Sequence, residues 1–93
     1  MTYKELKRRI KDEGLDDYAF IIFDKSYGPD FSVCVYKESD GTYSCIFNGE
    51  RSTIDYEEHN KPEEETCEMI YKYAVQEKRV ELAYQERVRQ MHK

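Results

Sequence analysis

The feature that most constrains this chain is a stretch of helical hydrophobic periodicity that runs from Pro62 to His92 without a glycine. At a rise of 1.5 Å per residue, a helix over this stretch is roughly 45 Å long, whereas a strand of eight residues spans only about 26 Å. The helix is therefore longer than any sheet that the rest of the chain can form. We expect part of it to project beyond the fold.

The apolar residues of this helix fall into two stripes when successive residues are placed 100° apart. We expect the first stripe to face the chain's own sheet; it consists of Cys67, Ile70, Tyr71, Ala74 and Val75, with Leu82 as a weak continuation. The second stripe lies roughly 120° further round the helix. Its members are Met69, Tyr73, Val80, Tyr84, Val88 and Met91.

Three interpretations remain open for the second stripe. The helix could bend to keep contact with the fold, the row could be exposed without a role, or the row could be a docking face. In the third case, the spacing of its C-terminal part suits a seam between two copies of the chain and predicts a homodimer. The self-association residues would then be Val80, Tyr84, Val88 and Met91.

The size and charge of the chain restrict its class. Its 93 residues predict a single domain, residues 1–93, with a modest core. The net charge of -5 argues against general binding of nucleic acid or of anionic membranes, because both require a basic face. No apolar run has the length of a signal-peptide core or a membrane span. The 3 cysteines lack CxxC spacing and suit reduced thiols, so we expect a cytoplasmic protein.

Local signals predict the first elements. The run Thr2-Tyr3-Lys4-Glu5 is a capping box that starts a helix, and Gly14 suits the left-handed residue that ends it. Residues 18–23 are aromatic and β-branched and predict a strand. The loop over residues 25–30 contains the breaker pair Gly-Pro, and residues 31–37 predict a second strand.

Two turn signals set the expected register of the sheet. Ser39-Asp40-Gly41 suits a three-residue hairpin loop with a bulge, which places Val35 across from Cys45. Asn48-Gly49 suits a two-residue type I′ turn, which would place Tyr43 across from Ile54. The expected core face of the sheet is then Phe31, Val33, Val35, Tyr43, Cys45, Phe47, Ile54 and Tyr56.

The order of elements predicts an α+β fold with the topology α-β-β-β-β-α. We expect a four-stranded antiparallel meander, with a short N-terminal helix and a long C-terminal helix packed on one face. The last strand leads through residues 59–62 into the long helix, whose first turn carries Glu63, Glu64 and Glu65 where the helix dipole favours anions.

Carboxylates far outnumber basic side chains between Glu50 and Glu68. One interpretation is a solvated surface, and the other is an electrostatic footprint for a basic partner. The second predicts an acidic edge with aromatic anchors beside it, since interface energy concentrates in a few desolvated residues. The expected partner-binding residues are Tyr27, Tyr36, Asp55, Glu57, Glu58, Glu63, Glu64 and Glu65.

The sequence predicts no catalytic, cofactor or metal site, and no enzyme activity. His59 follows Asp55 by four residues, but no nucleophile or glycine-rich oxyanion loop lies near it. We expect Cys45 and Cys67 to be small buried thiols, because neither histidine is spaced to join them around a metal. Cys34 lies on the opposite face of its strand and is the thiol expected to react.

One part of the chain resembles a known family. The stretch from Phe31 through the aromatic hairpin to Asn48-Gly49-Glu50-Arg51, followed by Pro62-Glu63-Glu64-Glu65-Thr66-Cys67-Glu68-Met69-Ile70-Tyr71, resembles small immunity proteins of bacterial polymorphic-toxin systems. In that group a short helix and a hairpin lead into a helix that opens with a Glu-Glu-x-x-Cys-like run. The chain departs from the pattern at Tyr43, where Trp is often expected, at His59-Asn60 and at Thr66.

The resemblance implies a stoichiometric inhibitor that binds a cognate toxin domain by occlusion and performs no chemistry. The acidic edge would suit a basic, nuclease-like toxin. A homodimeric, non-catalytic adaptor or regulatory module is the alternative, supported by the second stripe of the long helix. A small enzyme that uses His59 and Asp55 is the third hypothesis.

Overall fold

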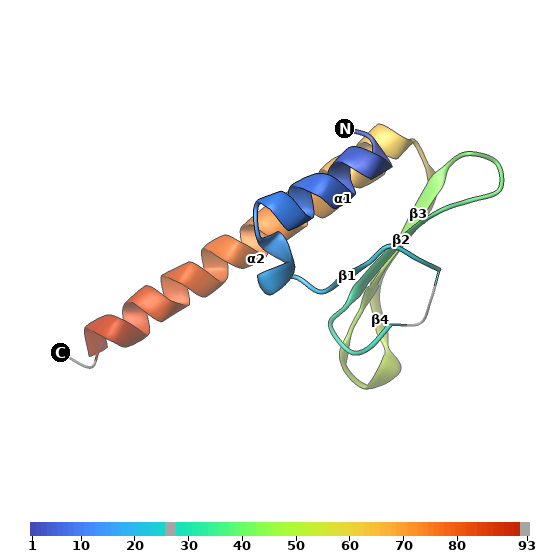
Figure 1. Ribbon diagram of the computed structural model, residues 1–93. Coiled ribbons are helices and arrows are strands. Elements are labelled where there is room, and N and C mark those ends of the chain that lie inside the picture. Colours follow the sequence, from blue (N-terminus) through green and yellow to red (C-terminus); the bar gives the residue numbers. More distant parts are fainter. Residues whose placement is uncertain (26–27, 92–93) are drawn as a thin grey trace.

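The computed structural model describes residues 1–25 and 28–91 (Figure 1), so Tyr27, one of the expected aromatic anchors, lies outside the described residues. The described chain confirms the α+β class: it has a four-stranded sheet, a short N-terminal helix and a long C-terminal helix. The elements in chain order are α1 (Tyr3–Asp12), η1 (Leu15–Asp17), β1 (Ile21–Ile22), β2 (Val33–Lys37), β3 (Tyr43–Asn48), η2 (Glu50–Ser52), β4 (Ile54–Lys61) and α2 (Glu63–Met91).

Helix α1 begins and ends where its local signals predicted. The Thr2 hydroxyl accepts a hydrogen bond from the Glu5 amide at 3.1 Å, and Gly14 adopts the left-handed conformation with φ 65°. The Tyr3 amide donates to the Glu63 carboxylate at 2.9 Å, which ties the start of α1 to the first turn of α2. The Glu63 carboxylate therefore links the two helices and also interacts favourably with the dipole of α2.

The sheet has the order β1-β2-β3-β4, but β1 pairs with β2 in parallel. The expected antiparallel meander is therefore wrong at its first strand, and the sheet is mixed. A parallel pair requires the connection to bring the chain back to the end of the sheet where β1 began. The connection between β1 and β2 is long enough for this, whereas a tight hairpin is not. This connection passes over the sheet at Gly28, where an added Cβ would lie 2.9 Å from Ile22 Cδ1 and 3.2 Å from Cys34 Sγ.

Strand β1 is also shorter than the expected strand over residues 18–23. The 3-10 turn η1 continues into that region, because the Tyr18 and Ala19 amides both donate to the Leu15 carbonyl at 3.0 Å. The strand is reduced to Ile21 and Ile22, preceded by a hydrogen bond from the Val33 amide to the Phe20 carbonyl at 2.8 Å.

The hairpin between β2 and β3 has the register that its turn predicted. Val35 lies opposite Cys45 and Val33 opposite Phe47. Gly41 has φ 88°, and the Glu38 amide donates to the Thr42 carbonyl at 2.8 Å to close the loop.

The expected two-residue turn between β3 and β4 is wrong. Asn48 pairs with Ile54, because η2 occupies the connection, and Gly49 is extended with φ -99°. Arg51 and Ser52 take the positive φ values of 55° and 62° instead. The Asp30 carboxylate holds this turn by accepting from the Arg51 amide at 3.0 Å and the Ser52 amide at 3.3 Å.

The longer turn changes which residues form the core. Five members of the expected core face are confirmed as buried or half-buried: Val33, Val35, Tyr43, Cys45 and Phe47. Phe31 and Ile54 are wrongly placed, since both are exposed and neither joins the core. Tyr56 lies on the expected face, opposite Phe47, but it is exposed at the edge of the sheet. Phe31 lies outside β2 with φ 65°, and the register shift of β4 beside Asn48 moves Ile54 off the core face.

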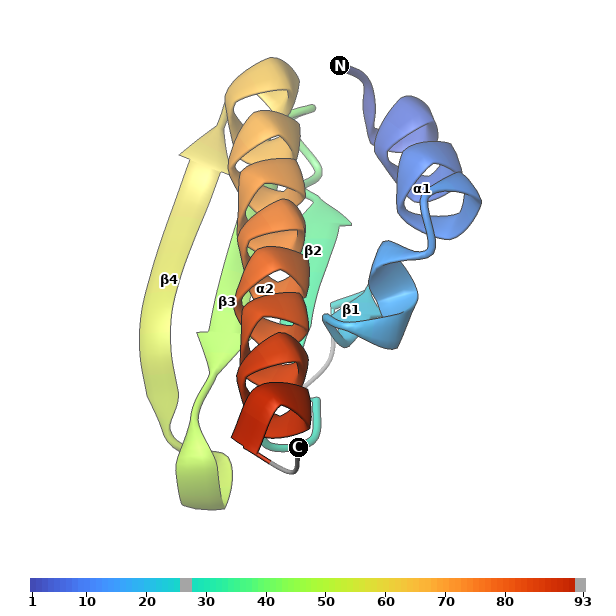
Figure 2. The same cartoon turned by 90° about the vertical axis from the view of Figure 1, so that its left-hand side faces the viewer.

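Both helices pack on one face of the sheet. The main hydrophobic core joins Leu6 and Ile10 of α1 and Ile70 and Ala74 of α2 to the inner residues of β2 and β3. Figure 2 shows α2 lying across β3 and β2, with α1 on the β1 side of the sheet. This packing confirms the first stripe of α2: Cys67, Ile70 and Ala74 are fully buried, Tyr71 and Val75 are half-buried, and only Leu82 is exposed.

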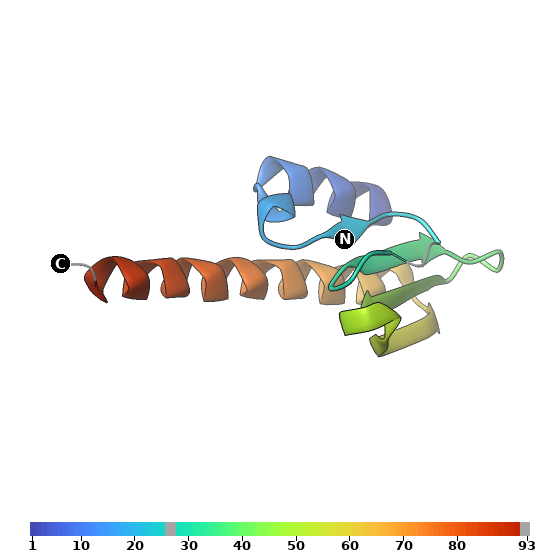
Figure 3. The same cartoon turned by 90° about the horizontal axis from the view of Figure 1, so that it is seen from below.

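The C-terminal part of α2 projects beyond the sheet (Figures 1 and 3). The projection gives the molecule its elongated shape, with principal extents of 55 × 30 × 16 Å. In the second stripe, Met69 and Tyr73 pack partly against the core. The C-terminal members Val80, Tyr84 and Met91 are 55%, 61% and 77% exposed, while Val88 is half-buried. The helix therefore does not bend back to cover them.

Candidate protein-binding site

The sheet face opposite the helices carries its own cluster of packed side chains. Cys34 and Tyr36 of β2 and Ile46 of β3 are buried there, with Ile22 packed against them. Alternation along each strand separates this cluster from Val33, Val35 and Cys45, which point to the helices. We call this surface the open face of the sheet.

A groove with a volume of about 420 Å³ crosses the open face. Its floor is made by Tyr36, Ile46 and Ile54, and its rim by Lys25, Glu38, Glu57 and His59. β4 supplies Ile54, Glu57 and His59 to one surface because the register shift beside Asn48 absorbs one extra residue of the strand.

Opposite charges and a phenol meet in this groove. Glu57 Oε2 lies 3.6 Å from His59 Nε2, and the Ser44 hydroxyl donates to Glu38 Oε1 at 2.7 Å. Burial of the ring, followed by the negative charge of Glu38, raises the pKa of the Tyr36 phenol. Lys25 Nζ lies 5.7 Å from the centre of the Tyr36 ring. The groove thus combines an aromatic floor, two carboxylates and one cation.

The structure divides the expected acidic edge among different surfaces. Glu57 lies in the groove, whereas Glu58 accepts a hydrogen bond from the Tyr56 hydroxyl at 2.7 Å. Asp55 lies near the start of β4, against Gly49, and Glu63 follows the end of that strand. The remaining members, Glu64 and Glu65, are exposed in the first turn of α2.

The aromatic anchor Tyr36 also differs from its expected role. Its side chain is only 6% exposed, so it forms the floor of a groove and does not protrude toward a partner. The sequence reasoning missed Lys25, Glu38, Ile46 and Ile54 as neighbours of Tyr36. The sequence does contain one signal for this groove: apolar residues also alternate on the second face of β2 and β3, and Tyr36 and Ile46 both lie on that face.

The structure places the three cysteines in the interior and His59 at the rim of the groove. Cys34, the thiol expected to react, is fully buried on the open face beside Gly28. Cys45 and Cys67 are confirmed as buried free thiols, and burial raises the pKa of each to about 11. In residues 1–25 and 28–91, no three His, Cys, Asp or Glu side chains are grouped so that they could hold a metal ion. His59 pairs with Glu57, and Asp55 packs on Gly49.

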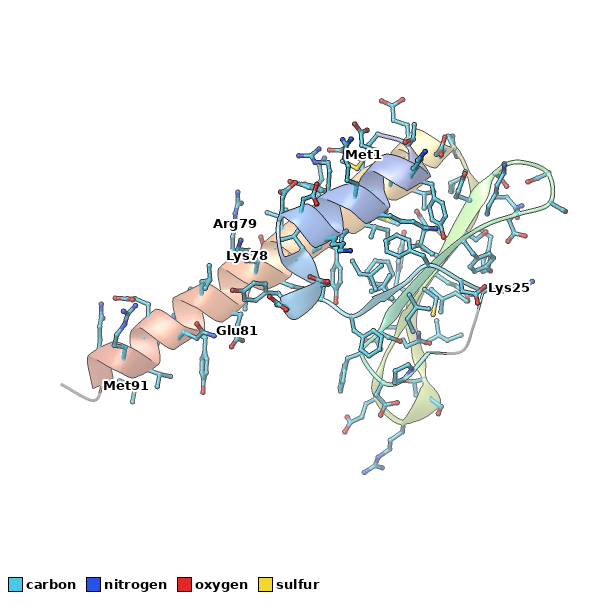
Figure 4. The ribbon with its side chains drawn as sticks, viewed as in Figure 1. Met1, Lys25, Lys78, Arg79, Glu81 and Met91 are labelled. Carbon is cyan, nitrogen blue, oxygen red and sulfur yellow. The ribbon has the colours of Figure 1, made fainter. Side chains whose placement is uncertain are left out.

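A second exposed surface lies on the projecting part of α2. Figure 4 labels Lys78, Arg79 and Glu81 along this part and Met91 at its end. Lys78 Nζ lies 5.8 Å from the centre of the Tyr18 ring, so η1 and its neighbours support the helix up to this point. Beyond it, Val80, Tyr84 and Met91 of the second stripe are exposed to solvent.

The fold and its surfaces define a small α+β domain with one helix-covered and one open sheet face. No family model, curated protein or solved structure matches the chain. Within the two described ranges, no helix combines the length and the apolar character that crossing a membrane requires.

Proposed function

We propose that this chain is an immunity protein that binds a cognate bacterial toxin domain in the cytoplasm and neutralises it by occlusion. The observation that carries the proposal is the groove on the open face, where Tyr36, Ile46 and Ile54 lie between the carboxylates of Glu38 and Glu57. Apolar and aromatic residues supply most of the energy of a protein interface, while charges orient the partner and speed its approach. The groove supplies both kinds of group.

The charge of the chain supports a basic, nuclease-like toxin as the partner. A domain that cleaves nucleic acid binds phosphates through a positively charged surface. The chain has a net charge of -5, and Glu38 and Glu57 bring negative charge to the groove itself. Association between the two proteins should therefore slow as salt concentration rises.

Co-expression with a candidate toxin domain tests the proposal, and the candidates are the C-terminal domains of long genes immediately upstream of this one. The wild-type chain should restore bacterial growth and should co-purify with the toxin domain in a fixed ratio. The variant Glu38→Lys/Glu57→Lys should weaken binding at least tenfold and reduce protection, while its melting temperature stays near that of the wild type. A wild-type chain that neither binds nor protects against the adjacent toxin would refute the immunity function.

A matched variant tests which acidic surface matters. Glu64→Lys/Glu65→Lys makes the same change of charge on exposed residues of the first turn of α2. This variant should protect as well as the wild type. Loss of protection here, with full protection by the groove variant, would assign binding to the acidic edge at the start of α2.

A homodimeric adaptor is the second candidate, favoured by the exposed C-terminal residues of α2. Val80, Tyr84 and Met91 form an apolar row that no residue in the described part of the chain covers. Sedimentation should then show a dimer at micromolar concentration, and Tyr84→Glu/Val88→Glu should convert it to a monomer. A wild-type monomer at high concentration would remove this candidate.

A further inference from the structure

We infer that the groove on the open face recognises an arginine side chain of a basic protein partner, which lies over Tyr36 between Glu38 and Glu57 and displaces Lys25. This inference rests on the proposed function, since it names the chemical group that the same site would bind. Three features of the groove carry it: its floor, its carboxylates and the cation already present.

The floor suits the aliphatic stem of a long basic side chain. Ile46 and Tyr36 are buried at the base of the groove, and Ile54 extends the apolar surface to the edge strand β4. Long cationic side chains lay their methylene groups along such surfaces and keep the charged end in a polar region. The volume of about 420 Å³ accommodates one such side chain together with part of its neighbours.

The carboxylates favour arginine over a neutral side chain. Glu38 is held in place by the hydrogen bond from Ser44 at 2.7 Å, and Glu57 faces the groove beside His59. The planar guanidinium group can stack on an aromatic ring while its N–H groups donate to carboxylate oxygens. The ammonium group of lysine is not planar and cannot combine the two contacts in this way. A pair of carboxylates beside a ring therefore matches arginine in shape as well as charge.

The structure already places a cation over the ring. Lys25 Nζ lies 5.7 Å from the ring centre of Tyr36, within the range of cation–π attraction. Lys25 is exposed and belongs to the connection between β1 and β2, on the side of the sheet away from the helices (Figure 4). An exposed lysine makes only a weak contact of this kind, so a partner's arginine can replace it at small cost.

Nuclear magnetic resonance titration with a small probe tests arginine recognition in the full chain. The probe is Nα-acetyl-arginine-N-methylamide, and its control is the citrulline analogue, which has the same shape without the charge. The arginine probe should cause saturable shifts in the backbone amides of Tyr36, Ile46 and Glu57, with a dissociation constant on the order of 1 mM for so small a ligand. The citrulline analogue should bind at least tenfold more weakly.

Three single substitutions locate the site. Glu57→Gln should weaken binding of the arginine probe several-fold, because it removes one carboxylate charge from the rim. Lys25→Gln should strengthen binding several-fold, because it removes the competing cation. Glu65→Gln, on the exposed first turn of α2, should leave binding unchanged. The amide spectrum of each variant reports directly that its fold is intact.

Equal binding of the arginine and citrulline probes would overturn the inference, as would wild-type affinity in Glu57→Gln or a loss of affinity in Lys25→Gln. The outcome is separable from that of the proposed function. Protection against the toxin without specific arginine binding would leave the immunity function standing and remove arginine recognition. Specific arginine binding without protection would retain the site and remove the immunity function.

Discussion

Raising the pH from 8 to 10.5 should destabilise this domain through two thiols in its core. Cys45 of β3 and Cys67 of α2 are fully buried, and burial raises the pKa of each from 9.0 to about 11. In the unfolded chain the same thiols are exposed to water and ionise near pH 9. The folded state therefore holds two protons that the unfolded state releases.

The size of the effect follows from this difference in proton binding. Stability from a raised pKa is fully present below the unfolded pKa of 9.0 and is lost as the pH rises through about 11. Each thiol lowers the free energy of unfolding by about 1.4 kcal/mol per pH unit within that window. At pH 10.5 the two thiols together cost up to about 4 kcal/mol, which is a large share of the roughly 5–14 kcal/mol expected for a domain of this length.

Urea denaturation in the presence of a reductant measures this loss at pH 8, 9, 10 and 10.5. The comparison protein is Cys45→Ala/Cys67→Ala, which should be less stable at pH 8 because its core has smaller side chains. Between pH 9 and 10, however, its free energy of unfolding should fall much less steeply than that of the wild type. Parallel pH profiles for the two proteins would refute the reasoning, since every other titrating group is common to both.

Further substitutions test the fold at other points. Gly28→Ala should lower the free energy of unfolding by about 1–3 kcal/mol in urea denaturation, because the new methyl group would overlap the Ser32 hydroxyl; wild-type stability would show that the connection over the open face is placed differently. Asp30→Ala should lower the melting temperature by about 4–8 °C, since the turn η2 loses an acceptor worth about 1 kcal/mol; an unchanged melting curve would contradict that role. A chain that ends after Ala83 lacks only projecting turns, so its melting temperature should change by less than about 5 °C; a collapse in thermal melting would show that these turns support the core.

Elements held by local chemistry could be predicted from the sequence. The N-cap at Thr2, the left-handed Gly14 and the three-residue loop ending at Gly41 act over a few residues, and each appears in the structure. The buried stripe of α2 was also predictable, because helical periodicity identifies the face that must meet a sheet.

The errors arose where residues distant in sequence decide the local conformation. Asn48-Gly49 favours a tight turn by itself, but Asp30, in the connection between β1 and β2, stabilises a longer turn. That change moved Ile54 to the open face and Asp55 away from the residues that follow β4. The direction of β1 likewise depends on how its connection packs over Cys34, for which the sequence contains no local signal.

The candidate site was only partly predictable for the same reason. Glu57 and Tyr36 were recognised by charge and aromatic character, but their meeting in one groove depends on the register of β4 against β3. A shift of one residue in that register would send Glu57 to the opposite face. Sequence reasoning therefore identified the kinds of group involved and missed which of them are neighbours.

The length of α2 also divides its backbone into two regimes of amide hydrogen exchange. Around Ile70 the helix is buried between α1 and the sheet, so we expect its amide hydrogens to exchange only when the whole domain unfolds. From Tyr84 onward the helix has solvent on most sides, and its turns open by fraying from the C-terminal end. One continuous helix thus passes from the buried core around Ile70 to a solvent-exposed C-terminal end, with the change falling where the sheet stops supporting it.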